Sequence, residues 1–341
     1  MKKKKDGEQE KESSTLDIAE LTDLANKSFK CDIGQASKPE FALSLVPTGI
    51  TVLDRLLGGG YPRGRLNIIT GPFGTGKTYI CHNLVANFQK QGLTCIWIDA
   101  ERRYNPLWAE KIGVDTNNLI LNRPTFGEEA IDLILFYLSK RVDLIVVDSV
   151  AALSPLAEIK ADMEQKFMGL QSNMLSTAFR KIIPENNNTV LMCINQLRQT
   201  IGSRFNPGVL KKMPGGDAQY YYSTSILEVT RKGWITEKGD DGKDEEEKTS
   251  AKRRSIGFNI NCFLEKCDFA LPFKSCDIPF NFVTAKIDDT SSIVDLAIDT
   301  GLIKQGGAWF YLGEEKIMGK QALLDWFNED TTRLEELKVK L

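Results

Sequence analysis

Residues 65–78, with the sequence RLNIITGPFGTGKT, decide the fold of this 341-residue chain. The first six residues form a short, mainly apolar run that predicts a buried strand. The next eight match the pattern G-x-x-x-x-G-K-[ST], and a helical pattern continues from residue 77 to about residue 90. A strand, a glycine-rich turn and a helix in this order are the context that a phosphate-binding loop requires. The stretch therefore predicts an α/β fold with a phosphate site in this turn.

The residue types of this loop suit a nucleotide. Glycines let backbone N–H groups turn inward around phosphates, and the helix N-terminus adds a favourable dipole. Lys77 is placed to reach the β- and γ-phosphates, and the Thr78 hydroxyl to bind Mg²⁺. A glycine-rich turn without a ligand is the alternative, which the complete motif disfavours. The candidate nucleotide-binding residues here are Gly71, Pro72, Phe73, Gly74, Thr75, Gly76, Lys77, Thr78 and Tyr79.

Three more apolar runs alternate with helical patterns along the chain. Strands are expected at residues 94–100, 143–149 and 189–196, with helices near 104–113, 127–140 and 164–183. Short apolar strands that alternate with helices form parallel sheets covered on both faces. The core is therefore expected to be a mainly parallel sheet flanked by helices.

Polar side chains stand where these strands end. Asp148 ends the run LIVVD, the place for an acid that holds Mg²⁺ through water, although it could instead cap the next helix. Glu101 follows the strand ending in Asp99 and Ala100, where a carboxylate could polarise a water that attacks the γ-phosphate. Acids are common after strands, so Glu101 alone is a weak signal. The Gln196 amide could bind a γ-phosphate, or be only a polar strand end.

The two ends of the chain differ from this core. Residues 1–14 are highly charged and lack an apolar segment, so a disordered tail is expected. Residues 15–30 predict a short amphipathic helix, followed by a linker. Consecutive strands are expected at 225–232 and 255–266, joined by the charged connection 239–254.

A small α/β unit is expected beyond this hairpin, with a helix at 291–300, an aromatic strand at 308–312 and a terminal helix from 319 to 327 and beyond. We therefore divide the chain into a tail (1–14), an N-terminal helix with its linker (15–46), a core (47–286) and a C-terminal α/β domain (287–341).

Composition excludes several classes of protein. One histidine, His82, rules out a multi-histidine metal centre. The seven cysteines include no C-x-x-C pair, which argues against a zinc ribbon or a disulfide framework and favours a reducing cytoplasm. No apolar run is long enough for a membrane span. Because 44 basic residues nearly balance 46 acidic ones, the formal net charge of -2 gives no global sign of a nucleic-acid partner.

Charge is concentrated locally, however. Residues 197–216 contain four basic side chains (Arg198, Arg204, Lys211 and Lys212) and no acid. A basic segment with Gly, Pro and Phe205 suits phosphate contacts combined with an apolar wedge between base steps. Each basic residue alone would be read as a solvated surface charge, but the cluster directly after Gln196 favours a nucleic-acid loop.

Taken together, these residues resemble the family of the bacterial recombinase RecA and its phage relatives over roughly residues 47–330. The most specific part is the string VDSVAAL (147–153), followed by MGL (168–170) and then by INQ-x-R (194–198). The resemblance implies an ATP-dependent helical filament on single-stranded DNA that pairs it with homologous duplex. It also implies DNA-stimulated ATP hydrolysis with Glu101 as base, roles in DNA repair and the SOS response, and a cytoplasmic location. A repressor or a single-strand-binding protein would be a further candidate partner.

The resemblance also implies site residues. Two loops, at about residues 158–169 and 197–216, would line the filament axis, and the helix of residues 15–30 would pack on a neighbouring subunit. Trp108 would stack on adenine, although a core tryptophan is the alternative. Together with the basic residues above, the implied DNA-binding positions are Met168, Gly169, Ser176, Arg180, Arg198, Ile201, Phe205, Gly215 and Gly216.

Three features depart from the family pattern. The family carries two lysines that reach the ATP of the adjacent subunit, whereas this chain has Lys266 and Asp268 at those places. Phe73 replaces an acid that is frequent in the loop, and a long acidic tail is missing. These departures leave two alternatives open: a nucleotide-gated DNA scaffold or signalling filament with weak hydrolysis, and a ring-shaped helicase of RecA fold.

Overall fold

The computed structural model describes residues 17–31, 33–161, 169–201, 209–236, 255–287 and 289–341. They belong to two compact units, Met1–Ser44 and Leu45–Leu341, which we describe separately. The tail predicted at residues 1–14 lies outside the described residues.

The first unit is built around helix α1 (Ile18–Ser28), with a short turn η1 (Pro39–Phe41) after it. The Asp17 and Glu20 side chains form a capping box that satisfies backbone N–H groups of the first turn. The apolar side chains Ile18, Leu21 and Leu24 are all exposed. The amphipathic helix predicted at residues 15–30 is therefore present, although it is shorter.

A sheet dominates the second unit. Among the described residues its strand order is β13-β12-β11-β10-β3-β7-β6-β4-β5. The strands from β3 to β5 in this order are parallel, β10 is parallel to β3, and β11 to β13 are added antiparallel. The bounds are β3 (Arg65–Thr70), β4 (Cys95–Asp99), β5 (Leu119–Asn122), β6 (Leu144–Asp148), β7 (Val190–Ile194), β10 (Ser225–Thr236), β11 (Ser255–Cys267), β12 (Ser275–Asn281) and β13 (Lys286–Ile287).

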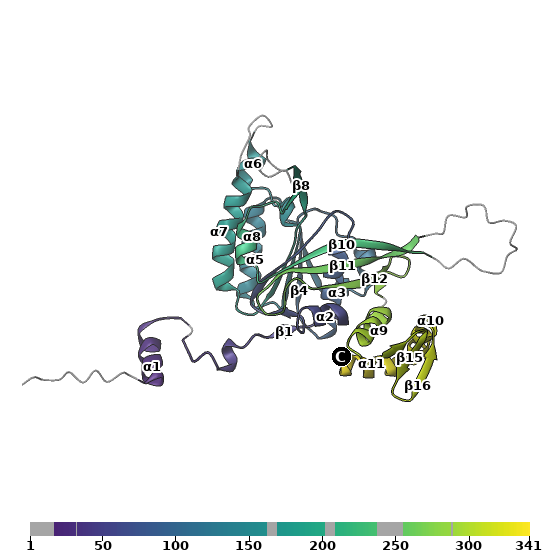
Figure 1. The fold of residues 1–341 in the computed structure, drawn as a ribbon. Helices are drawn as coiled ribbons and strands as arrows, with labels where there is room; N and C mark the ends of the chain where they lie inside the picture. Colours follow the sequence, from purple (N-terminus) through teal and green to yellow (C-terminus); the bar gives the residue numbers. More distant parts are fainter. Residues whose placement is uncertain (1–16, 32, 162–168, 202–208, 237–254, 288) are drawn as a thin grey trace, which may run out of the picture. The chain divides into compact units, whose positions relative to one another are not determined.

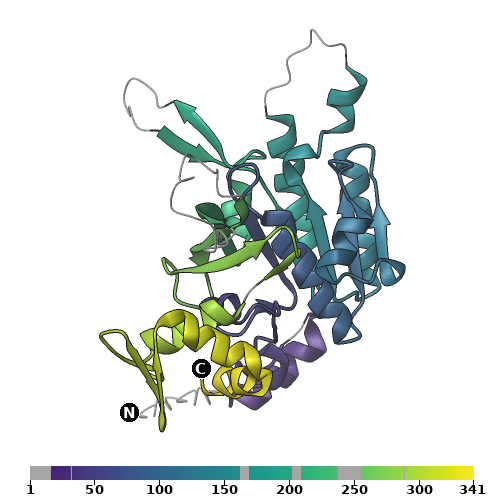
Figure 2. The same ribbon diagram turned by 90° about the vertical axis from the view of Figure 1, so that its right-hand side faces the viewer.

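Helices cover both faces of this sheet (Figures 1 and 2). One face carries α2 (Thr51–Leu56), α3 (Lys77–Lys90) and α4 (Pro106–Ile112), and the other carries α5 (Gly127–Ser139), α7 (Leu170–Glu185) and α8 (Ala218–Tyr222). The short elements η2 (Thr116–Asn118), η3 (Val150–Ala152) and α6 (Leu156–Lys160) connect them. The predicted mainly parallel sheet between helices is confirmed.

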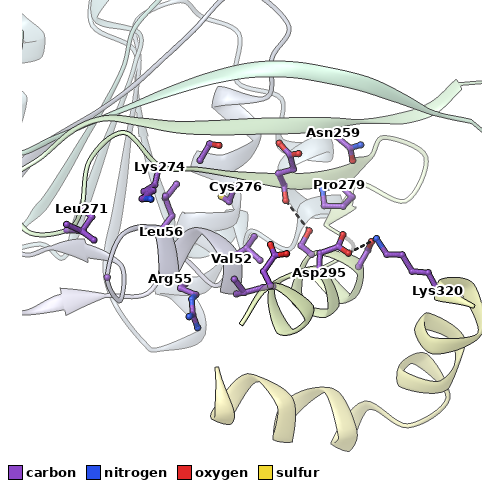
Figure 3. Close-up of a pocket in the computed structure, with 18 of the residues that line it drawn as sticks. Val52, Arg55, Leu56, Asn259, Leu271, Lys274, Cys276, Pro279, Asp295 and Lys320 are labelled. Carbon is purple, nitrogen blue, oxygen red and sulfur yellow. Dashed lines mark hydrogen bonds and ion pairs between the residues drawn. The ribbon is translucent and has the colours of Figure 1, made fainter. Parts of the chain in front are cut away.

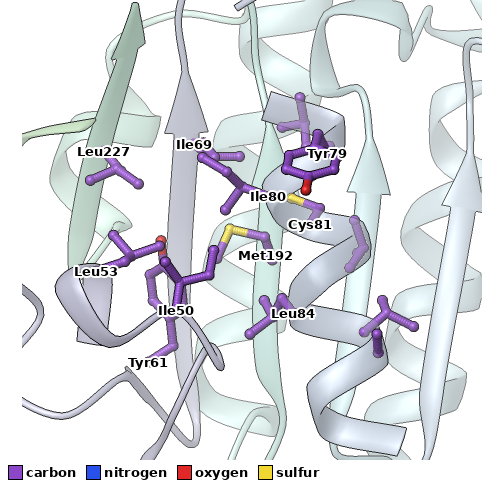
Figure 4. Close-up of a cluster of buried hydrophobic side chains, with 14 of the residues drawn as sticks. Ile50, Leu53, Tyr61, Ile69, Tyr79, Ile80, Cys81, Leu84, Met192 and Leu227 are labelled. Atoms are coloured by element: carbon purple, nitrogen blue, oxygen red, sulfur yellow. The ribbon is translucent and has the colours of Figure 1, made fainter. Parts of the chain in front are cut away.

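Each face of the sheet has its own hydrophobic core, because consecutive residues of a strand point to opposite sides. Ile69 of β3 packs on one face with Ile80 and Leu84 of α3 (Figure 4). Its neighbour Ile68 packs on the other face with Phe179 of α7. Both residues are fully buried, so β3 is held firmly where it delivers the chain to the phosphate loop.

Two small antiparallel pairs complete the region before β10. β1 (Leu45–Val46) pairs with β2 (Tyr61–Pro62), and β8 (Arg198–Ile201) pairs with β9 (Val209–Lys212). Figures 1 and 2 both show α6 and the β8–β9 hairpin at the same end of the unit, at the top of each view. The described parts of the two segments expected to be DNA loops therefore lie at one end of the unit.

The C-terminal segment has a third core. Helices α9 (Asp289–Asp299), α10 (Lys320–Glu329) and α11 (Thr331–Lys340) pack with a three-stranded antiparallel sheet, β14 (Lys304–Gly306), β15 (Trp309–Leu312) and β16 (Glu315–Met318). Phe310 and Phe327 are buried at its centre. This arrangement matches the small α/β unit expected from residue 287, and the exact domain boundaries stay a proposal.

Some elements differ from the expectation. β5 and β12 were not predicted, and the strand expected at 189–196 ends at Ile194, so Asn195 and Gln196 lie beyond it. The helix expected at 164–183 is α7, which is described from Leu170 and continues to Glu185. The connection 239–254 falls outside the described residues.

Candidate nucleotide and DNA site

The phosphate loop is pressed against the sheet. Gly71 has a φ of 152°, and a Cβ on it would lie 2.1 Å from the carbonyl oxygen of Val229 in β10. Gly76, at the N-cap of α3, has a φ of 97°, and a Cβ there would lie 2.6 Å from Cδ1 of Ile260 in β11. Both positions favour glycine because both φ values are positive, and a Cβ at Gly71 would also collide with the backbone of β10.

Lys77 is folded back over the loop that precedes it. Its Nζ donates to the carbonyl oxygens of Gly71, at 2.9 Å, and Pro72, at 2.7 Å. The Thr75 hydroxyl donates to the same Pro72 oxygen at 3.0 Å. Burial lowers the pKa of Lys77 below its usual value, while the carboxylates of Asp148 and Glu101 oppose this shift. A largely buried cation without a carboxylate in direct contact is a suitable partner for a phosphate.

Thr78 and Asp148 meet at the base of the loop. The Thr78 hydroxyl donates to Oδ2 of Asp148 at 3.2 Å, which joins the first turn of α3 to the end of β6. Burial and the charge of nearby Glu101 raise the pKa of Asp148 to about 7. A hydroxyl and a carboxylate whose charge is poorly compensated fit Mg²⁺, which binds few protein oxygens and takes further ligands from phosphates and water.

Glu101 lies beside this pair, with its carboxylate held by residues from other strands. Its Oε1 accepts hydrogen bonds from the Ser149 hydroxyl, at 2.6 Å, and from Nε2 of Gln196, at 3.1 Å. The exposed Arg103 guanidinium lies 3.5 Å from Oε2. The carboxylate faces a cavity of about 350 Å³ lined by Ala100, Glu101, Arg103, Ala151, Ala152, Gln196 and Arg198. An acid in such a place can orient and deprotonate a water.

Ser149 was missed by the sequence analysis. Its side chain is buried, and its hydroxyl donates to the Glu101 carboxylate. In the sequence, only the position of Ser149 directly after Asp148 suggests a role. That position does not reveal the contact with Glu101, which lies 48 positions earlier in the chain.

Two residues predicted to contact the nucleotide also pack against the protein core. The Tyr79 ring packs on Phe280 with 3.9 Å between ring centroids, and its hydroxyl donates to the carbonyl oxygen of Ala285. Trp108 is partly buried against the same core and meets Phe280 edge-on at 6.4 Å. The Tyr79 side chain is therefore engaged within the protein, and stacking of the partly buried Trp108 ring on adenine stays a prediction. Phe73, by contrast, is 90% exposed.

Lys266 is engaged within the chain. Its Nζ donates to the carbonyl oxygens of Tyr220, at 2.9 Å, and Ser223, at 2.6 Å, at the C-terminal end of α8. Asp268 is exposed two residues further on. To reach a nucleotide on a neighbour, the Lys266 amine would have to leave both carbonyls.

The expected DNA positions lie on α7 and the β8–β9 hairpin. Gly169 is the N-cap of α7, and Arg180, exposed on that helix, donates to the carbonyl oxygen of Ser176 at 3.2 Å. Arg198 and Lys212 are exposed and directly opposite each other in the hairpin register. Two facing cations repel each other unless an anion lies near them, which favours a polyanionic partner.

The remaining predicted DNA positions lie partly within the described residues. Met168, Arg204 and Phe205 lie outside the described residues, and only the backbone of Ile201 and Lys211 is described. Gly215 and Gly216 have φ values of 93° and 81° and lie against α7.

A phosphate loop before α3, an acid at the end of another parallel strand of the same sheet and a second acid facing a cavity define an ATPase of the P-loop class. The family model described as the RecA N-terminal domain matches residues 20–283. The chain is 35% identical over 337 residues to Protein RecA of Lactobacillus johnsonii, covering 95% of this chain and 89% of that protein. It is 34% identical over 309 residues to Protein RecA of Thermus aquaticus, covering 89% and 86%.

The chain belongs to the RecA family. It is accordingly a DNA-dependent ATPase with a RecA-type role in recombination and repair. Within the described part of the chain, every helix is too short or too polar to cross a membrane.

Proposed function

We propose that the chain forms helical filaments on single-stranded DNA in the ATP-bound state and uses them for homologous pairing and strand exchange. The observation that carries this proposal is the hydrogen bond from Gln196 to Glu101, because it joins a candidate hydrolytic carboxylate to a residue that lies just before the basic hairpin, which begins at Arg198. ATP chemistry and DNA contact would then share one side chain.

The proposed roles at the nucleotide follow from the geometry. The loop N–H groups and Lys77 would bind the phosphates, and Lys77 would exchange its two carbonyl partners for phosphate oxygens. Thr78 and Asp148 would hold Mg²⁺, which when bound offsets phosphate charge. The raised pKa of Asp148 supports this role, since a bound cation would favour its ionised form.

Glu101 is proposed as the general base. Ser149 and Gln196 hold one carboxylate oxygen, and the other lies 3.5 Å from the exposed Arg103 guanidinium. Glu101 lines the cavity in which a water could be held for attack. The Gln196 amide could instead donate to a γ-phosphate, and that exchange would free Glu101 while moving the start of the hairpin. ATP binding would in this way favour one arrangement of the DNA loop.

The DNA contacts are proposed from charge and position. Arg198 and Lys212 on the hairpin, together with Ser176 and Arg180 on α7, would bind the phosphates of a single strand. Met168, Arg204, Phe205 and Lys211 remain in this proposal on sequence grounds. A cytoplasmic location, a self-assembled filament, and a repressor or single-strand-binding protein as partner are also part of it.

One experiment tests the proposal. Phosphate release by the purified chain should rise when single-stranded DNA is added, and electron microscopy of the same sample should show filaments only with ATP or a slowly hydrolysed analogue. Lys77→Ala should remove both results, because the phosphates lose their buried cation. Closed rings as the only assembly would favour the helicase alternative, and absence of assembly on DNA would contradict the proposal.

A second candidate is a nucleotide-gated DNA scaffold with little turnover. The engagement of Lys266 with two carbonyls and the exposed Asp268 favour it, since neither group is arranged to stabilise a phosphate on a neighbour. ATP-dependent filaments that hydrolyse ATP very slowly would support this candidate over the first.

A further inference from the structure

A buried amide side chain, Gln219 in the first turn of α8, contacts both the end of β7 and the segment that follows β9. The side chain is 0% exposed. Its Nε2 donates to the carbonyl oxygens of Pro214, at 2.6 Å, and Gly216, at 3.3 Å. Its Oε1 accepts from Nδ2 of Asn195 at 2.6 Å. Both the donor and the acceptor of the Gln219 amide are therefore engaged. They connect Asn195, just before the β8–β9 hairpin, to Pro214 and Gly216, just after it.

Asn195 continues this connection toward the nucleotide. It too is 0% exposed, and its Nδ2 also donates to the carbonyl oxygen of Pro214 at 3.1 Å. Its Oδ1 accepts from the backbone N–H of Gln196 at 2.8 Å, while its own N–H donates to the carbonyl oxygen of Ile69 in β3. Asn195 is therefore anchored on the central sheet and fixes the backbone from which the Gln196 side chain projects.

The bonds form an unbroken series: Glu101, Gln196, Asn195, Gln219 and then Pro214 with Gly216. Asn195 and Gln219 are buried and Gln196 is half-buried, and a buried polar group that loses its partner costs about 1–3 kcal/mol. If Gln196 moves, a matching shift of Asn195 and Gln219 therefore costs less free energy than breaking the hydrogen bonds between them.

The far end of the series is restrained on its other side. A Cβ on Gly215 would lie 2.4 Å from Cδ1 of Leu175, and one on Gly216 would lie 2.8 Å from Cβ of Ser172. Both contacts are with α7, the helix that also carries Ser176 and Arg180. Residues 214–216 follow β9 closely, so their position sets where the Lys212 end of the hairpin leaves the body of the unit.

We infer that Gln219 is a positioning residue that transmits the nucleotide-dependent position of Gln196 to the β8–β9 hairpin and α7. This inference rests on the proposed function. Gln219 stands between Ala218 and three tyrosines and belongs to no sequence motif, so this role emerges only from its contacts. Neutral amides suit the task, because each can donate and accept at once and keeps its state at any physiological pH.

The test compares Gln219→Met with Gln89→Met in the full chain. Methionine has nearly the same length as glutamine but lacks both hydrogen-bonding ends. Gln89 is a matched control because its amide also makes two hydrogen bonds to a backbone segment, one to the carbonyl oxygen and one from the N–H of Asp115. It is not part of the series that joins Glu101 to Gln219. The quantity measured is the dissociation constant for a fluorescent single-stranded oligonucleotide, with a slowly hydrolysed ATP analogue and with ADP.

In the unsubstituted chain and in Gln89→Met, the analogue should tighten DNA binding at least tenfold relative to ADP. In Gln219→Met this ratio should fall below threefold, while affinity for a fluorescent nucleotide stays within twofold. A purely structural role would lower the thermal midpoint without changing the ratio. A ratio in Gln219→Met equal to that of the control would overturn the inference and leave the proposed function standing. A ratio near one in the unsubstituted chain would contradict the proposed function itself.

A second measurement does not depend on the variant folding. Hydrogen exchange of the unsubstituted chain should show that peptides covering residues 213–222 change protection when ADP is replaced by the ATP analogue. Peptides from β3 should not change, since that strand is buried in the sheet. Unchanged protection over 213–222, alongside nucleotide-dependent DNA binding, would exclude transmission through Gln219.

Discussion

Nε2 of Gln196 lies 3.1 Å from Oε1 of Glu101, although 95 residues separate the two along the chain. The contact exists because β4 and β7 both flank β6 in the parallel sheet, so the residues that follow them emerge at the same edge. The candidate base is therefore held by a neutral amide. Because the Gln196 amide carries no charge, it leaves no unpaired cation behind when it moves away from the carboxylate, so this bond is suited to change with the nucleotide.

Glu101→Gln should separate hydrolysis from binding. We expect steady-state phosphate release to fall by at least about 100-fold, the usual contribution of a positioned base. Affinity for a fluorescent ATP analogue should remain within threefold, because the phosphate contacts come from the loop and Lys77. Ser149→Ala is the companion variant: loss of one hydrogen bond to the carboxylate should slow release by only about tenfold. Unchanged turnover in Glu101→Gln would remove this residue from the chemistry.

Gly71→Ala and Gly74→Ala should differ sharply. Both positions have positive φ, so each alanine carries a backbone cost of about 1–2 kcal/mol. A Cβ at Gly74 would meet nothing within 4 Å, whereas one at Gly71 would lie 2.1 Å from the carbonyl oxygen of Val229. We expect Gly74→Ala to bind nucleotide within fivefold of the unsubstituted chain and Gly71→Ala to lose more than 20-fold, by fluorescence titration. Equal losses would mean that loop flexibility, rather than packing on β10, controls binding.

His82→Phe should flatten the acid side of the stability curve. His82 is buried, stacks on Trp97 with 4.6 Å between ring centroids, and has no hydrogen-bond partner for either ring nitrogen within the described residues. Burial lowers its pKa from 6.5 to about 4. Because the unfolded chain binds this proton below pH 6.5 and the folded chain does not, stability is complete above pH 6.5 and is lost as the pH falls toward 4.

The expected size is about 2 kcal/mol between pH 8 and pH 5, from the 1.36 kcal/mol that each pKa unit represents. Urea denaturation at both pH values should show that the unsubstituted chain loses this much more unfolding free energy than His82→Phe. Parallel losses in the two chains would show that the ring takes up a proton while the protein stays folded.

Replacing Lys211 and Lys212 by alanine should change the salt dependence of DNA binding. Each phosphate contact on a single strand contributes about 0.7 to the slope of log affinity against log salt. We expect the double variant to reduce that slope by about 1.4, measured by fluorescence anisotropy between 50 and 300 mM salt. Lys90→Ala, an exposed cation at the end of α3, should leave the slope unchanged. A uniform loss of affinity with an unchanged slope would place both lysines away from the phosphates.

Much of the architecture could be predicted from local patterns, and the failures have physical causes. β12 carries Pro279 and several polar residues, so its alternation is weak, and it forms through pairing with β11. β5 has only four residues, with Ile120 and Leu121 exposed, and its pairing with β4 makes it a strand. The Trp108 position was ambiguous because a partly buried indole suits a core and a ligand equally well.

The local sequence alone determined the phosphate loop, the parallel strands and the acids at their ends. Steric preferences and apolar periodicity act between residues close in the chain, so the order of side chains is enough to predict them. Only the tertiary structure decided that Ser149 and Gln196 hold Glu101, that Lys266 is engaged by two carbonyls, and that Gln219 links Asn195 to Pro214. These are hydrogen bonds of a few ångströms between residues distant in the chain, and they exist only because sheet register and buried packing bring those groups together.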